Sequence, residues 1–161
     1  MRKKLLIHQY IIKETKERRH RMKDRIMIMS REEITRFKLS GGDAVISFYD
    51  AGTEPVTIGN CGAEICYVEL DDIDSDEPGF DYDGFFPEAG AVAEFIICAI
   101  TAGKRIICQC EYGMSRSAGC AAAILEYYQG SGITVFADDR YCPNKAVFRK
   151  LLDAQKAAHR V

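Results

Sequence analysis

Short apolar segments alternate along this chain with longer segments in which apolar residues recur at helical spacing. The short segments are rich in β-branched residues and predict four strands: 25–29, 44–49, 64–70 and 105–108. A helix is expected to begin at Ser30, where Glu33 gives a capping box, and three longer helices are expected over 87–102, 117–128 and 143–159. Strands that alternate with helices in this way predict an α/β fold, with a mostly parallel central sheet flanked by helices on both faces.

Length and charge restrict the class of protein further. The 161 residues suit one domain, which we place at 25–161, behind a basic N-terminal arm over 1–24. The net charge of −2 gives no general electrostatic reason to expect binding to nucleic acid or to an anionic membrane. No apolar stretch approaches the roughly 20 residues of a membrane span, and no secretory signal is recognised. We therefore expect a cytoplasmic protein without nucleic-acid or membrane partners.

The cysteines and histidines exclude several kinds of site. The chain has seven cysteines, an odd number with irregular spacing, which fits reduced thiols in the cytoplasm better than a disulfide framework. Cys61 and Cys66 lack the spacing and the second pair that a zinc site needs. Histidines occur only at 8, 20 and 159, away from the central sheet, so a Cys–His protease or a His-rich metal site is poorly supported. We expect no metal and no cofactor.

The segment 109–117 (Gln-Cys-Glu-Tyr-Gly-Met-Ser-Arg-Ser) carries the strongest chemical signal. It joins the predicted strand 105–108 to the predicted helix 117–128, and such a loop turns successive backbone N–H groups inward beside the positive end of a helix. Such a field favours the thiolate form of a cysteine at the base of the loop, here Cys110. Arg116 offers a planar, bidentate fork to two phosphate oxygens. Residues 110–116, which we call the phosphate loop, thus combine a nucleophile, an anion-binding backbone and a positively charged side chain.

These residues resemble the signature Cys-x5-Arg-Ser/Thr of the cysteine-dependent protein tyrosine phosphatases. Gly113, Ser115 and Ser117 fit the Cys-x-x-Gly-x-Ser-Arg-Ser form of the small dual-specificity-like branch, and the chain looks closest to small bacterial members. The resemblance implies that Cys110 forms a phosphocysteine. It also implies that the loop binds the substrate phosphate through residues Glu111, Tyr112, Gly113, Met114, Ser115 and Arg116, and that the Ser117 hydroxyl donates to the Cys110 sulfur.

The same resemblance implies a general acid, an Asp on a separate loop after an earlier strand. Here the strand 64–70 runs directly into a segment rich in carboxylates and aromatic residues, the acidic loop (71–86). Asp72 is our first candidate, because small bacterial members place an Asp just before an apolar residue and Ile73 follows. Four other carboxylates remain open as alternatives: Asp74, Asp71, Asp81 and Asp83.

One residue departs from the family pattern. Gln109 stands where the family has a His that orders the loop through hydrogen bonds, and an amide can also donate and accept. We therefore expect an active enzyme whose Cys110 is somewhat less readily ionised than that of its relatives.

The expected substrate is a phosphorylated protein or peptide, with phosphotyrosine as the default, or a small aryl phosphate. Glu111 and Met114 stand where phosphoinositide-directed relatives carry lysines, and an acidic Glu111 at the mouth would repel highly charged headgroups. Two rival functions remain open: a catalytically weak pseudophosphatase that binds phosphorylated partners, and a sulfur transferase of the rhodanese kind, which shares the Cys-x5-Arg spacing.

Overall fold

A four-stranded parallel sheet organises the molecule. The computed structural model describes residues 22–59 and 61–158, so most of the N-terminal arm predicted over 1–24 lies outside the described residues. The strands are β1 (Ile26–Met29), β2 (Asp43–Tyr49), β3 (Glu64–Glu69) and β4 (Arg105–Gln109). Their order is β1-β4-β2-β3, and every neighbouring pair is parallel. The four predicted strands and their parallel arrangement are confirmed.

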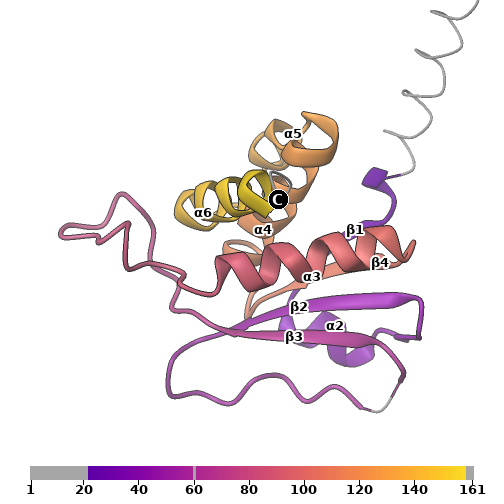
Figure 1. The fold of residues 1–161 in the computed structure, drawn as a ribbon. Helices are drawn as coiled ribbons and strands as arrows, with labels where there is room; N and C mark the ends of the chain where they lie inside the picture. The colour runs from indigo at the N-terminus through magenta and orange to yellow at the C-terminus, as the bar shows by residue number, and fades with distance from the viewer. Residues whose placement is uncertain (1–21, 60, 159–161) are drawn as a thin grey trace, which may run out of the picture.

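Helices cover both faces of this sheet, as the sequence predicts. They are α2 (Arg31–Arg36), α3 (Ala89–Thr101), α4 (Arg116–Gln129), α5 (Ile133–Phe136) and α6 (Lys145–Ala158). In Figure 1, α3, α4 and α6 lie on one side of the sheet and α2 on the other. Ser30 and Glu33 form the predicted capping box at the start of α2. The short α5 was not predicted, and α3 begins two residues after Pro87, which lies in the turn before the helix.

Alternating side chains of β2 show why both faces must be covered. Ala44, Ile46 and Phe48 pack into the main core with α3, α4 and α6, whereas Val45 joins a smaller core under α2. Residues 43–48 are all buried, because a central parallel strand is enclosed on both sides. Parallel strands also end at the same edge, so the residues that follow β1, β2, β3 and β4 meet there, where α/β sheets place their ligands.

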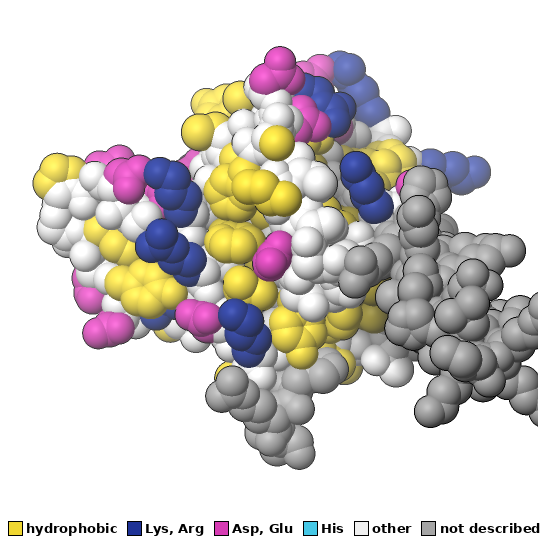
Figure 2. All heavy atoms as spheres, turned by 90° about the horizontal axis from the view of Figure 1, so that it is seen from above, with side chains coloured by type: hydrophobic (Ala, Val, Ile, Leu, Met, Phe, Trp, Pro, Cys, Tyr) yellow, Lys and Arg dark blue, Asp and Glu magenta, His cyan; other side chains and the backbone are white. Residues whose placement is uncertain are grey.

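The surface over α5 and α6 carries side chains of both charges. Lys and Arg side chains stand there among acidic and hydrophobic ones, and the described residues form no continuous basic field in this view (Figure 2). None of the helices in the described part of the chain has the length and apolarity needed to cross a membrane.

Candidate active site

The phosphate loop lies between β4 and α4, at the carboxyl edge of the sheet. Gly113 has φ = 66°, and a Cβ at this position would lie 2.6 Å from the Ser30 backbone nitrogen. Only glycine therefore lets the loop turn this closely against the end of β1. The loop is also tied to that strand by the Cys110 N–H, which donates to the Met29 carbonyl at 3.3 Å, and by the Arg31 N–H, which donates to the Glu111 carbonyl at 3.1 Å.

Several donors of this loop have no hydrogen-bond partner in the part of the chain that the structure describes. Among the described residues, the backbone N–H groups of 111–115 donate no hydrogen bond. Arg116 is 2 % exposed, and its Nε is buried without a hydrogen-bond partner in the described part of the chain. Its Nη1 donates to Asp50 Oδ1 at 2.8 Å and to the Leu70 carbonyl at 2.5 Å, which holds the guanidinium in place. A buried, unpaired donor beside free amides at a helix N-terminus is the arrangement that an oxyanion completes.

Cys110 and Ser117 are in direct contact. Cys110 Sγ lies 3.0 Å from Ser117 Oγ, and the two residues are 2 % and 0 % exposed. A thiolate at this position would accept a hydrogen bond from the Ser117 hydroxyl, the contact that the resemblance implies. These two residues are seven positions apart in the sequence, and the structure brings their side chains together at the base of the loop.

Asp72 reaches the phosphate loop from the acidic loop. Its Oδ1 accepts a hydrogen bond from Ser115 Oγ at 2.7 Å, and its Oδ2 lies 3.9 Å from Arg116 Nε. The carboxyl group is 35 % exposed, so it stands between the buried guanidinium and solvent. The Asp72 carboxyl group thus borders the phosphate loop on its solvent side.

The other four carboxylates lie elsewhere. Asp71 Oδ1 accepts the Ala51 N–H at 2.9 Å, which anchors the loop after β2. Asp81 and Asp83 lie farther along the acidic loop, where the carbonyl of Asp81 accepts the Phe85 N–H and the carbonyl of Asp83 accepts Lys150 Nζ. Within the described residues, neither contacts the phosphate loop. Of the five candidates, Asp72 is the one whose side chain does.

Asp74 serves the N-terminus of α6. Its two carboxylate oxygens accept the N–H groups of Lys145 and Ala146, each at 3.1 Å. Partial burial alone would raise the pKa of Asp74, but the hydrogen bonds from Lys145, Ser75 and Ala146 outweigh burial and hold that pKa below its ordinary value. A carboxylate kept ionised by a helix N-terminus is a poor proton donor, which argues against Asp74 as the general acid.

We expect Asp74→Ala to destabilise the protein by about 1 kcal/mol at pH 7, the usual effect of losing a helix cap. The lowered pKa of Asp74 fixes the pH dependence, because a carboxyl group with a depressed native-state pKa stabilises the fold above its unfolded-state value of about 3.9. This contribution is lost as the pH falls through the native-state pKa, so the two proteins should converge in acid. Urea unfolding at neutral and acid pH measures this, with the exposed Asp83→Ala as control. A difference that persists in acid would contradict the assignment.

Gln109 occupies the family's His position as a buried, hydrogen-bonded amide. It is 1 % exposed and is the register partner of Ser47 on β2. Ser47 Oγ donates to Gln109 Oε1 at 2.5 Å, and Gln109 Nε2 donates to the Cys110 carbonyl at 2.8 Å. The amide therefore both accepts and donates, as the sequence analysis supposes, and holds the backbone of Cys110 from the α2 side of the sheet.

Gln109→His should make Cys110 react at lower pH, because an imidazolium adds positive charge that an amide lacks. We expect the midpoint pH of iodoacetate alkylation to fall by a fraction of a pH unit. Mass spectrometry of the Cys110 peptide over a pH series measures the midpoint, with Gln129→His as a control distant in sequence. An unchanged midpoint would refute the expectation.

Two residues at the site were not predicted from the sequence. Asp50 directly follows β2 and pairs with Arg116, and the rule that parallel strands end at one edge could have found it. Asn144, just before α6, donates from Nδ2 to Asp72 Oδ1 at 3.1 Å. No local pattern connects residues 72 and 144, so this contact could not be predicted from the sequence.

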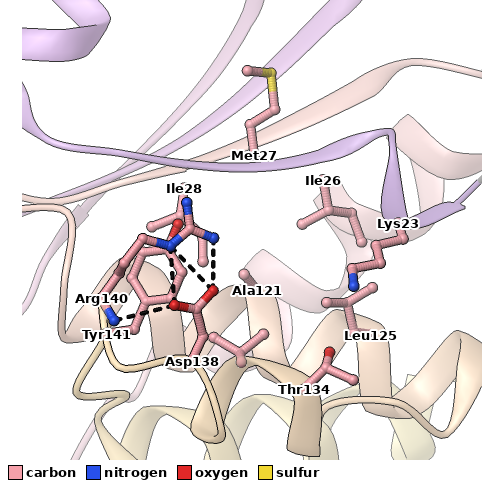
Figure 3. Close-up of a pocket in the computed structure, with 11 residues that line it drawn as sticks. Lys23, Ile26, Met27, Ile28, Ala121, Leu125, Thr134, Asp138, Arg140 and Tyr141 are labelled. Carbon is pink, nitrogen blue, oxygen red and sulfur yellow. Dashed lines mark hydrogen bonds and ion pairs between the residues drawn. The ribbon is translucent and has the colours of Figure 1, made fainter.

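A separate cavity of about 320 Å³ lies between β1, α4 and α5 (Figure 3). Ile26 and Ile28 of β1 line it on one side and Leu125 of α4 on the other, and the ion pair between Asp138 and Arg140 stands at one end. None of the predicted site residues lines it. The predicted site residues lie instead in and beside the phosphate loop, at the carboxyl edge of the sheet.

Comparison with known proteins establishes what this fold is. The sequence matches no protein-family model and no curated protein. Among solved structures, PTPMT1 in complex with PI(5)P has a TM-score of 0.54 at 14 % identity, over 84 % of this chain and 94 % of that one. A point variant of human DUSP28 has a TM-score of 0.52 at 18 % identity, over 84 % of this chain and 92 % of that one. The chain has the fold of dual-specificity-like phosphatases.

A further structure of PTPMT1 has a TM-score of 0.50 at 15 % identity, over 83 % of this chain and 89 % of that one. Identities this low establish the fold alone. The roles of individual residues therefore rest on the geometry of the phosphate loop and its neighbours.

Proposed function

We propose that the protein is a phosphomonoester hydrolase of the protein tyrosine or dual-specificity phosphatase class, acting through a phosphocysteine on Cys110. One observation carries the proposal. The Cys110 sulfur lies 3.0 Å from the Ser117 hydroxyl, at the base of a loop in which the N–H groups of 111–115 and the Arg116 Nε have no hydrogen-bond partner among the described residues. A nucleophile and unpaired oxyanion donors meet at one point, as covalent phosphoryl transfer requires.

The chemistry proceeds in two displacements. In the first, the Cys110 thiolate attacks phosphorus, the bond from phosphorus to the ester oxygen breaks, and the leaving oxygen takes a proton from Asp72. In the second, the Asp72 carboxylate takes a proton from water, the water oxygen attacks phosphorus, and the S–P bond breaks to release phosphate. The loop amides and Arg116 stabilise the charge on the phosphoryl oxygens in both steps, and Ser117 stabilises the departing thiolate.

The charges around the loop favour a phosphorylated protein or an aryl phosphate over a phosphoinositide. Asp50 and Asp72 both lie beside Arg116, and a polyanionic headgroup would meet their negative charge. Glu111 repels less than its sequence position suggests, because its carboxylate forms an ion pair of 2.7 Å with Arg31. Tyr112 and Met114 are 79 % and 46 % exposed at the loop and give an apolar rim for an aromatic ring. PI(5)P is the lipid to compare with a phosphotyrosine peptide in assays, because PTPMT1, which has a similar fold, has a structure in complex with PI(5)P.

The phosphate-loop motif and the cysteines also bear on the family branch and the cellular location of the protein. The phosphate-loop motif supports a place among the small bacterial dual-specificity-like phosphatases, with residues 25–161 as one catalytic domain. All seven cysteines are free thiols, which supports a reducing cytoplasmic location for an enzyme that depends on a thiolate.

Hydrolysis of p-nitrophenyl phosphate in EDTA between about pH 5 and 8 tests the proposal, because thiolate and carboxylic acid should both be competent there. We expect turnover that vanadate inhibits, and faster turnover of a phosphotyrosine peptide than of PI(5)P. No turnover, with tungstate still bound, would favour the phosphate-binding pseudophosphatase. Turnover of thiosulfate instead would favour a sulfur transferase.

A further inference from the structure

We propose that Asn144 is a positioning residue, which holds the Asp72 carboxyl group in place for proton transfer. The inference rests on the proposed function. Asn144 directly precedes α6 and is 1 % exposed, so its amide is enclosed by protein. A buried amide of this kind is stable only when its donors and its acceptor are satisfied, and each of its partners therefore bears on its role.

The side chain of Asn144 has one possible orientation. Its Oδ1 accepts the Val147 N–H at 2.9 Å and thereby caps α6. Because this partner is a donor, the Asn144 oxygen must face α6, and the NH2 group must face the acidic loop. Nδ2 donates there to Asp72 Oδ1 at 3.1 Å and to the Ile73 carbonyl at 2.9 Å. One side chain thus fixes both the carboxylate of Asp72 and the backbone that follows it.

The backbone of Asn144 is fixed against the phosphate loop. Its N–H donates to the Ser115 carbonyl at 3.1 Å. Its carbonyl oxygen would lie 2.5 Å from a Cβ at position 119, so Gly119 is what allows α4 to approach this segment. The same residue therefore contacts the acidic loop and the loop that carries Arg116, and sets the distance between them.

This arrangement makes the two oxygens of Asp72 unequal. Oδ1 accepts hydrogen bonds from Ser115 Oγ and from Asn144 Nδ2. Oδ2 has no hydrogen bond within the described residues and lies 3.9 Å from Arg116 Nε. Oδ2 is thus the oxygen left to carry the proton to the leaving group, and the hydrogen bonds to Oδ1 prevent the carboxyl group from rotating.

Asn144→Ser separates positioning from capping. Serine is as good a helix cap as asparagine, so the contact with Val147 can be kept, whereas the donors to Asp72 and Ile73 are lost. Asn144→Asp is a second variant that keeps a capping oxygen and replaces the NH2 donor by a carboxylate facing Asp72. Lys145→Ala is the matched control, because the Lys145 side chain contacts Asp76 and not Asp72.

The test compares leaving groups, because a poor leaving group depends on the proton donor far more than a good one. For Asn144→Ser we expect kcat to fall about tenfold or more with phenyl phosphate and less than about threefold with p-nitrophenyl phosphate. The alkaline limb of the kcat–pH profile should also move. In a protein that already carries Asp72→Asn, Asn144→Ser should lower kcat little further, because Asn144 acts through Asp72.

Three results would decide whether Asn144 positions Asp72. Equal losses on both substrates that add to the loss from Asp72→Asn would show that Asn144 only caps α6, and would overturn the inference. Wild-type kinetics in Asn144→Ser, with Cys110-dependent turnover intact, would overturn the inference and leave the proposed function standing. A wild-type protein without turnover would remove the proposed function, and the positioning role with it.

Discussion

Cys110→Ser should abolish phosphatase turnover while leaving oxyanion binding intact. A hydroxyl in place of the thiol is not ionised at neutral pH and cannot form the phosphocysteine, so we expect a loss on the order of 10⁴-fold or more. Binding should survive because Arg116 and the loop amides do not depend on the sulfur. Hydrolysis of p-nitrophenyl phosphate and the rise in Tm on adding tungstate measure the two properties separately.

Cys98→Ser is the matched control for this substitution. Cys98 is an exposed free thiol on α3, and its replacement should leave both properties unchanged. Turnover retained in Cys110→Ser would contradict the assignment of the nucleophile.

Arg116→Lys should lose both turnover and oxyanion binding. Lysine keeps the positive charge but not the planar fork, so it cannot reproduce the contacts to Asp50 and the Leu70 carbonyl while presenting further donors to a phosphate. We expect kcat/KM to fall on the order of 10³-fold, in line with the removal of a donor that stabilises transition-state charge. The tungstate-induced rise in Tm should shrink in parallel.

Arg36→Lys is the control for this change, because Arg36 is an exposed arginine on α2 paired with Glu32. Asp50 is 47 % exposed, so its carboxylate can be solvated when its ion pair with residue 116 is weakened, and the fold should stay intact. An Arg116→Lys protein that binds tungstate as tightly as wild type would show that the guanidinium does not hold the phosphate.

The sequence predicted those parts of the molecule that depend on local patterns. Periodicity placed all four strands, and the Cys-x5-Arg spacing placed the phosphate loop between β4 and α4. The predicted helix over 143–159 appears as α6, with residue 159 outside the described residues. The short α5 was missed because its four residues are too few to show a helical period.

Tertiary contacts explain what the sequence could not supply. The resemblance ranked Asp72 ahead of Asp74 and Asp71, but the sequence left all three open. The structure separates them by what each side chain faces: the phosphate loop, the N-terminus of α6 and the backbone of Ala51, respectively. Likewise, the sequence indicated that the Gln109 amide could donate and accept but not which partners it has, and the register of β2 and β4 places Ser47 beside it. Such distinctions arise from chain segments that are distant in sequence.

The central claim is that the phosphoryl group passes through the Cys110 sulfur. The most direct measurement is rapid quenching of wild-type protein during turnover of p-nitrophenyl phosphate, followed by mass spectrometry of the Cys110 peptide. We predict one added phosphoryl group on Cys110, appearing as fast as the first p-nitrophenolate is released and absent from Cys110→Ser. Steady turnover with no phosphoryl group on Cys110 at any time, or with the group on another residue, would contradict the account.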